Sequence, residues 1–222
     1  MNGAVTHYEN GLAAKSVGEY PRAIGELQLA IEIDPHHAES HQELGWLTYG
    51  TGGELLHARE HLETAIRINP ELGDAHMYLG IVLNRLSRHQ ESELCFRMAL
   101  TLSADPALVH STFAEEFLWH NGRYGEAEEH FLTALRLSPD SVLALLDYAR
   151  MLTCHGRDSE AKRLFVRALD IDPDDSHTKR AYGEFVRETV SEARDANECL
   201  RAAIHKDPRY VEGIAILNSR TP

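Results

Sequence analysis

Fourteen histidines are the side chains of this sequence best suited to chemistry, because imidazole nitrogens bind zinc and other transition metals. His57 and His61 stand four residues apart, at a helical spacing, and His36 and His37 stand near His41. A zinc site on a helix usually adds an acidic ligand or a further histidine, and neither group has one at an obvious spacing. The His-Glu-x-x-His motif is also absent. We therefore expect no bound metal.

Motifs for other chemistry are missing too. The sequence has no glycine-rich phosphate loop, no nucleophile elbow and no paired catalytic carboxylates. Its aspartates and glutamates are scattered, as on solvated helix faces. We expect no enzymatic activity and no cofactor.

One histidine pattern has a regular period. His7, His41 and His76 recur at intervals of 34 and 35 residues. Each stands four residues before a glycine, at Gly11, Gly45 and Gly80 respectively. The first interpretation is a partly buried histidine that serves as a flat spacer between helices. The second is a pH-sensitive N-terminal half.

Composition excludes several classes of partner. The 35 acidic residues exceed the 22 basic ones, and a net charge of -13 would repel a nucleic-acid backbone. No stretch approaches the length of a membrane span, and the N-terminus does not resemble a secretory signal. The three cysteines have no metal or disulfide spacing and suit the cytoplasm, although a periplasmic domain without disulfides would look the same.

Six prolines recur along the chain at nearly constant intervals of 35, 36, 33, 34 and 35 residues. Such self-similarity is typical of repeat architectures. Each proline closes a similar phrase, such as AIEIDP or ALDIDP, that indicates a helix end followed by a breaker. The prolines are Pro35, Pro70, Pro106, Pro139, Pro173 and Pro208.

Stricter columns lie within each repeat and predict its second helix, helix B. Two columns of small residues flank one column of large apolar residues, at the spacing of one helix face. The first small column is Ala23, Ala58, Ser92, Ala127, Ala161 and Ala196, and the second is Ala30, Ala65, Ala99, Ala134, Ala168 and Ala203. The large column is Leu27, Leu62, Phe96, Phe131, Phe165 and Leu200.

A further column predicts the first helix, helix A. We call it the anchor column, and turn residues such as Asn121-Gly122-Arg123 separate it from helix B. No repeat can cover its apolar face alone, so the repeats must stack into a solenoid. The anchor column is Gly11, Gly45, Gly80, Glu115, Ala149 and Gly183.

These columns, with phrases such as GEYPRAI at residues 18–24 and NGRYGEA at 121–127, resemble tetratricopeptide repeats. The resemblance implies an all-α, right-handed α-solenoid of about six helix-turn-helix units. After Pro208, the helical spacing of Val211, Ile214 and Leu217 predicts a C-terminal capping helix, and a seventh repeat cut short would show the same spacing. Glu115 departs from the small residue expected at its position. We predict one array over 4–210, with units at 4–37, 38–72, 73–107, 108–141, 142–175 and 176–210, and the capping helix at 211–219.

The resemblance also implies that a second face of each helix A lines a concave groove for a partner peptide. That face gathers large apolar and aromatic residues, including both tryptophans, which a solvated face should not do. We expect Trp46 and Trp119 to bind a partner and not to stabilise the fold. The predicted groove residues are Tyr8, Leu12, Trp46, Tyr49, Met77, Ile81, Asn84, Arg85, Thr112, Glu116, Trp119, Leu146 and Arg150.

The sequence thus predicts a scaffold or adaptor that binds a protein or peptide. Leu12 and Lys15 in the first repeat do not reproduce the Lys and Asn clamp with which some family members hold a C-terminal carboxylate. The cationic flanks, such as Arg85 and Arg150, favour an amphipathic helix or an extended apolar segment with some acidic residues. The alternative is a self-associating component of an assembly such as a secretion or pilus system, in which identical copies cover the apolar faces.

Overall fold

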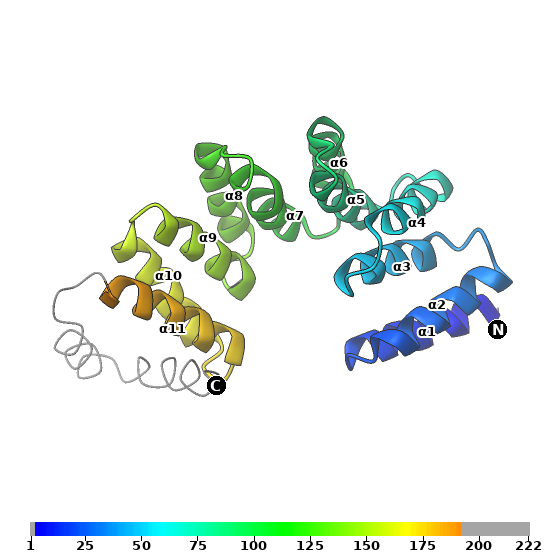
Figure 1. Cartoon of the computed structure of the whole chain (residues 1–222), viewed down its shortest axis with the longest axis horizontal. Coiled ribbons are helices and arrows are strands. Elements are labelled where there is room, and N and C mark those ends of the chain that lie inside the picture. Colours follow the sequence, from blue (N-terminus) through cyan, green and yellow to red (C-terminus); the bar gives the residue numbers. More distant parts are fainter. Residues whose placement is uncertain (1–2, 192–222) are drawn as a thin grey trace. The chain divides into compact units, whose positions relative to one another are not determined.

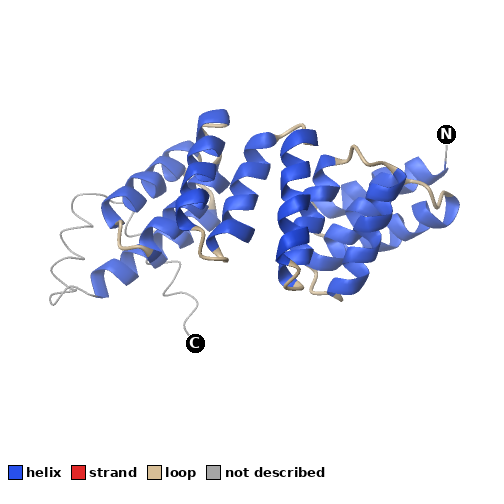
Figure 2. Cartoon of the chain, turned by 90° about the horizontal axis from the view of Figure 1, so that it is seen from above, coloured by secondary structure: helices blue, strands red, loops and turns tan. Residues whose placement is uncertain are grey.

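The computed structural model describes residues 3–191, which form helices joined by short turns, with no strand in that range (Figure 2). The all-α fold class is therefore confirmed. The chain divides into two compact units, Met1–Gly122 (unit 1) and Arg123–Pro222 (unit 2). The predicted second helix of the sixth repeat and the predicted capping helix at 211–219 lie outside the described residues.

Unit 1 consists of three helix pairs and the first helix of a fourth (Figure 1). The first three A helices each pack against the B helix that follows, and each of the three B helices packs against the next A helix. The A helices are α1 (Gly3–Ser16), α3 (Ala38–Gly50), α5 (Gly73–Arg85) and α7 (Pro106–Phe113), which continues as the π-helix η1 (Ala114–Trp119). The B helices are α2 (Tyr20–Ile33), α4 (Leu55–Ile68) and α6 (His89–Leu102).

Unit 2 begins with a B helix and continues the same alternation. Helix α9 packs against α8, α10 and α11, and α10 also packs against α11. The helices are α8 (Tyr124–Leu137), α9 (Val142–Cys154), α10 (Asp158–Ile171) and α11 (Ser176–Ser191).

Two kinds of residue end the helices. Pro35, Pro70, Pro139 and Pro173 each follow the C-cap residue of a B helix, where a proline ring would clash with the preceding turn if the helix continued. The A–B turns need one residue with positive φ, a conformation that favours glycine. The positive-φ residues are Gly18, Gly52, Ser87, Gly122 and Gly156, each seven residues after an anchor.

The predicted columns form the core of the B helices. In α2, α4, α6, α8 and α10, the members of both small columns and of the large column are almost completely buried. Phe96, Phe131 and Phe165 are among the largest side chains with no appreciable exposure. Burying such a side chain contributes about 2–3 kcal/mol to folding. Ser92 fits among the alanines of its column because its Oγ donates to the carbonyl of Gly80 at 2.7 Å.

The anchor column marks where helices A and B approach most closely. A Cβ added at Gly45 would lie 2.7 Å from Cγ of Leu62 and 3.0 Å from the carbonyl oxygen of Ala58. Glu115 occupies the equivalent position in the fourth repeat, and there the A helix widens into the π-helix η1. We attribute the widened turn to the longer side chain, because a π turn gives it room that an α turn lacks.

Candidate protein-binding surface

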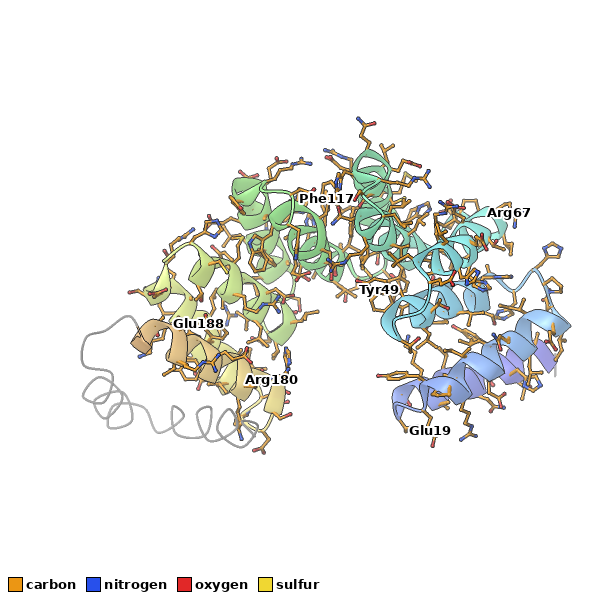
Figure 3. The ribbon with its side chains drawn as sticks, in the orientation of Figure 1. Glu19, Tyr49, Arg67, Phe117, Arg180 and Glu188 are labelled. Atoms are coloured by element: carbon orange, nitrogen blue, oxygen red, sulfur yellow. The ribbon has the colours of Figure 1, made fainter. Side chains whose placement is uncertain are left out.

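One side of unit 1 carries most of the predicted groove residues. Figure 3 shows Tyr49 of α3 and Arg67 of α4 on opposite sides of the unit. We call the side that holds Tyr49 the A-helix surface, since α1, α3, α5, α7 and η1 supply its residues. Its partly or largely exposed members are Tyr8, Leu12, Lys15, Trp46, Tyr49, Asn84, Arg85, Thr112, Glu116 and Trp119.

An aromatic cluster lies near the centre of this surface. The ring of Trp46 stacks on the ring of Tyr78 with centroids 4.5 Å apart and an interplanar angle of 14°. Tyr49 lies one helical turn along α3, with its ring centroid 5.4 Å from that of Trp46. All three side chains are partly buried, so neighbouring helices fix the rings while leaving part of their area accessible. Fixed aromatic rings lose little entropy on binding and often dominate an interface.

An ion pair connects the first two repeats at one side of the cluster. Nζ of Lys15 in α1 lies 2.6 Å from Oε2 of Glu43 in α3, and the amide of Gln42 donates to the other carboxylate oxygen at 3.3 Å. Glu43 is buried, with 7% of its surface exposed. A buried carboxylate requires such partners, so Lys15 serves to hold Glu43 in place.

Arg85 connects three repeats on the other side of the cluster. Its Nε donates to the hydroxyl of Tyr49 at 3.3 Å, and its Nη2 lies 2.6 Å from Oε2 of Glu116. Burial and the neighbouring carboxylate of Glu115 raise the pKa of Glu116 to about 7, although Arg85 opposes that shift. Glu116 can therefore exchange a proton near neutral pH.

Asn84 ties the π-helix to α5. Its Nδ2 donates to the carbonyl oxygen of Glu116 at 2.6 Å. Its Oδ1 lies 2.8 Å from Nδ1 of His89 and accepts from Nδ2 of Asn121 at 3.2 Å. A π turn changes the hydrogen-bond partners of the backbone carbonyls. The side chain of Asn84 supplies a donor to one of these carbonyls, that of Glu116. The network fixes η1, and with it the positions of Glu116 and Trp119.

Three predicted groove residues are buried in the structure. Met77, Ile81 and Leu146 are each no more than 3% exposed, so they offer a partner almost no surface. Leu146 belongs to unit 2, as does Arg150, which is exposed and pairs with Asp147 at 3.3 Å. Trp119 and Thr112 are partly buried. The residues that the structure brings together on unit 1 are those around Trp46, Tyr49, Arg85 and Glu116.

Two of the three periodic histidines are packed as expected. His41 and His76 are buried, and Nε2 of each donates to a proline carbonyl, that of Pro35 at 3.2 Å and that of Pro70 at 3.0 Å. His7 differs from them. It is partly exposed and its Nδ1 lies 2.8 Å from Oε2 of Glu26, an acid on α2 that the histidine spacing could not reveal.

His41 also pairs with a histidine of α4. Nδ1 of His41 lies 3.2 Å from Nδ1 of His61. Since Nε2 of His41 donates to a carbonyl, its Nδ1 accepts when the ring is neutral, and Nδ1 of His61 donates. Burial lowers the pKa of both rings; the charge of Arg67 lowers the pKa of His41 further, and a charge on His41 lowers the pKa of His61 further. The pair is thus held neutral.

The sequence pattern did not identify Tyr78 and Glu43 as residues that support the A-helix surface. Both stand two residues before an anchor and contact the preceding repeat, where Glu43 pairs with Lys15 and Tyr78 stacks on Trp46. The signal was available in the register: this position in one repeat faces positions one to four after the anchor in the repeat before it.

Neither a metal-binding cluster nor a membrane-spanning helix occurs among the described residues. In residues 3–191 no group of three or more histidine, cysteine, aspartate or glutamate side chains could hold a metal ion. Within the same range, every helix is too short or too polar to cross a membrane.

Comparisons with known proteins agree with the architecture. Two family models described as tetratricopeptide repeat match residues 48–107 and 118–184. A curated relative from Homo sapiens, protein O-mannosyl-transferase TMTC2, is 32% identical over 68 residues, which make up 31% of this chain and 8% of that protein. The chain therefore corresponds to a small part of that relative.

Solved structures extend the likeness over nearly the whole chain. PilW, whose title describes it as a widely conserved type IV pilus biogenesis factor, is 18% identical with a TM-score of 0.74, over 96% of this chain and 98% of that one. YrrB, titled a TPR protein with an unusual peptide-binding site, is 22% identical with a TM-score of 0.53, over 81% and 91%. At these identities the likeness concerns the fold. With the repeat columns, the helix pairs and both family models in agreement, the chain belongs to the tetratricopeptide repeat family.

Proposed function

We propose that this protein is a non-catalytic adaptor that binds a partner protein or peptide on the A-helix surface of unit 1. The observation that carries the proposal is the cluster of Trp46, Tyr49 and Tyr78, which is stacked and partly exposed. Partly exposed aromatic rings in fixed positions are common anchors of protein interfaces.

The polar ties around the cluster support the same function. Lys15 with Glu43, and Arg85 with Tyr49 and Glu116, connect A helices of consecutive repeats and hold the surface in one conformation. A surface fixed before binding loses less conformational entropy when a partner arrives. The titles of PilW and YrrB, which concern pilus biogenesis and a peptide-binding site, support a role in an assembly or peptide-binding process.

Affinity capture with matched variants tests this function. The bait is the full chain, incubated with extract of the cells in which it occurs, and bound proteins are identified by mass spectrometry. Trp46→Ala with Tyr49→Ala removes two anchors, whereas Leu56→Ala with Leu94→Ala removes two exposed apolar side chains of B helices. We expect specific partners to be lost from the first variant and retained by the second.

Two outcomes contradict the proposal. Equal capture by both variants would show that the A-helix surface does not bind the partner. Recovery of the chain itself, together with a particle size that rises with protein concentration in light scattering, would favour self-association.

A further inference from the structure

Net charge is distributed unevenly between the two units. Residues 1–122 contain 17 acidic and 7 basic side chains, a net charge of -10 with histidine neutral. Residues 123–222 contain 18 acidic and 15 basic side chains, a net charge of -3. Unit 1 therefore carries most of the negative charge of the protein, and it also carries the aromatic cluster.

The A helices of unit 1 show the same imbalance. Apart from histidine, they carry six acidic side chains and two basic ones. The basic ones are Lys15 and Arg85, and each pairs with a carboxylate of the next repeat at 2.6 Å. Neither cation therefore leaves a net positive charge on the surface. The acidic side chains are Glu9, Glu39, Glu43, Asp74, Glu115 and Glu116.

The pKa values of Tyr8 and Tyr78 reflect the negative charge of carboxylates near the aromatic rings. Burial, followed by the charges of Glu43 and Glu39, raises the pKa of Tyr8. Burial, followed by the charges of Glu43 and Asp74, raises the pKa of Tyr78. The charge of each phenol is thus opposed by carboxylates of the A helices α3 and α5, and a cation at the same place would be stabilised by them.

We propose that the partner segment bound by the A-helix surface of unit 1 is basic, with lysine or arginine side chains set among apolar anchors. This inference rests on the function proposed above and specifies the chemistry of the partner. The apolar anchors contact Trp46 and Tyr49, and the basic side chains lie toward Glu39 and Asp74, whose charges act on Tyr8 and Tyr78. The faces of Trp46 and Tyr49 also attract a cation directly. Complementary charge of this kind determines partner choice and accelerates association.

This partner differs from the one that the sequence alone favoured. Arg85 and Arg150 were expected to attract acidic residues. In the structure Arg85 pairs with Glu116, and Arg150 belongs to unit 2 and pairs with Asp147. Once both cations are neutralised by neighbours, the remaining charge of unit 1 favours a basic segment.

A displayed library of random twelve-residue peptides is the probe. It is selected against the full wild-type chain, and the residues enriched among bound peptides are counted. We expect lysine, arginine, leucine and aromatic residues to be enriched and aspartate and glutamate to be depleted. A bound peptide is then synthesised with a fluorescent label, and its dissociation constant is measured by anisotropy at rising salt concentration.

Paired variants separate the surface charge from the overall charge. Glu39→Gln removes an acidic side chain of the A helix α3, whereas Glu32→Gln removes an exposed acidic side chain of the B helix α2. We expect the first variant to weaken peptide binding about twofold to fivefold at low salt, the effect of removing one partner of an exposed charge pair. The second variant should bind as the wild type does.

The outcomes distinguish this inference from the proposed function. Selected peptides without basic enrichment, or an equal loss of affinity in both glutamine variants, would overturn the basic-partner inference. Peptides whose binding does not depend on Trp46 and Tyr49 would instead overturn the proposed function. Melting curves of each variant, recorded alongside, show whether a loss of affinity accompanies a loss of fold.

Discussion

Units 1 and 2 share one packing pattern but differ in what their A helices expose. In both units the large column of the B helices is buried, as Phe96 is in unit 1 and Phe165 in unit 2. The A helices of unit 1 expose parts of Trp46 and Tyr49, whereas those of unit 2 expose Arg150 and other charged residues. Positions that stabilise the fold are therefore alike in both units, and positions that the fold leaves free can differ.

Polar ties also serve different purposes in the two units. In unit 2, Glu128 accepts from the hydroxyl of Tyr148 at 2.6 Å and from Arg157 at 2.7 Å, which joins α8 to α9 and to the start of α10. In unit 1 the corresponding hydrogen bonds join one A helix to the next, through Arg85 and Glu116. The network of unit 2 thus joins A and B helices, whereas the network of unit 1 fixes the surface that we propose binds a partner.

The largest effect should come from the shared core. The ring centroid of Phe165 lies 6.0 Å from that of Tyr182 and 5.1 Å from that of Phe185, so Phe165→Ala leaves a cavity beside both rings. We expect a loss of about 3–5 kcal/mol in the free energy of unfolding. Hydrogen exchange should show the loss in α9, α10 and α11. Equal loss of protection in α1–α4 would contradict the division of the chain into two compact units.

A smaller loss should follow from filling the anchor of unit 1. In Gly45→Ala the new methyl group meets Leu62 and the backbone of Ala58, which costs about 1–3 kcal/mol before the gain in helix propensity is counted. Gly25→Ala in α2 is the matched control, because nothing lies within 4 Å of its Cβ position. Urea unfolding should show the first variant less stable than wild type and the second more stable by about 0.5–1 kcal/mol. Equal effects would show that close approach does not constrain the anchor.

The neutral pair of His41 and His61 should make the stability of unit 1 depend on pH. Because the pKa values of His41 and His61 are lowered by folding, their contribution is complete above the unfolded value of about 6.5 and is lost as pH falls below it. Glu116 acts in the opposite direction: its pKa is raised from 4.5 to about 7, so its contribution declines as pH rises between those values.

Melting curves between pH 5 and 7.5, recorded in a Glu116→Gln background, separate the two contributions. The background protein should become more stable as pH rises. Addition of His41→Gln and His61→Gln should flatten that slope, since other carboxylates titrate alike in both proteins. Parallel slopes would remove the histidine pair as a cause.

The smallest effect concerns one turn in each unit. Ser87 has a φ of 60° where four other turns have glycine. Ser87→Gly should therefore stabilise the protein by about 0.5–1 kcal/mol, and Gly156→Ser in unit 2 should destabilise it by a similar amount. Thermal unfolding of both variants measures the pair of changes. A loss of stability in the glycine variant would show that the Ser87 side chain contributes more than its backbone strain costs.

The sequence predicted the core well because repetition made the core visible. Every B-helix column residue from Ala23 to Ala168 is buried where the spacing placed it. A single helix face follows from 100° per residue, and six copies of it confirm one another. The helix pairs and their turns followed from the same repetition.

The candidate surface was less predictable, since it depends on neighbouring helices. Met77 and Tyr8 hold the same repeat position, yet Met77 is buried and Tyr8 is partly exposed. A helical wheel shows which residues share a face and does not show which neighbour covers them. Trp46 also stacks on Tyr78 and so contributes to packing between repeats. The prediction that Trp46 does not stabilise the fold therefore needs this correction. The π-helix at Glu115 had no signal beyond an oversized anchor residue.

Site-specific photo-crosslinking tests whether a partner protein binds the A-helix surface of unit 1. A benzophenone amino acid is introduced at Tyr49 in unit 1 or at Thr153 in unit 2, which hold the same repeat position four residues after an anchor. Both proteins are expressed in the cells in which the chain occurs, irradiated, and analysed by mass spectrometry. We expect a covalent complex with a partner protein from position 49 and only background from position 153. Crosslinking from 153 at an equal or higher level, or none from 49, would contradict the assignment of partner binding to the A-helix surface of unit 1.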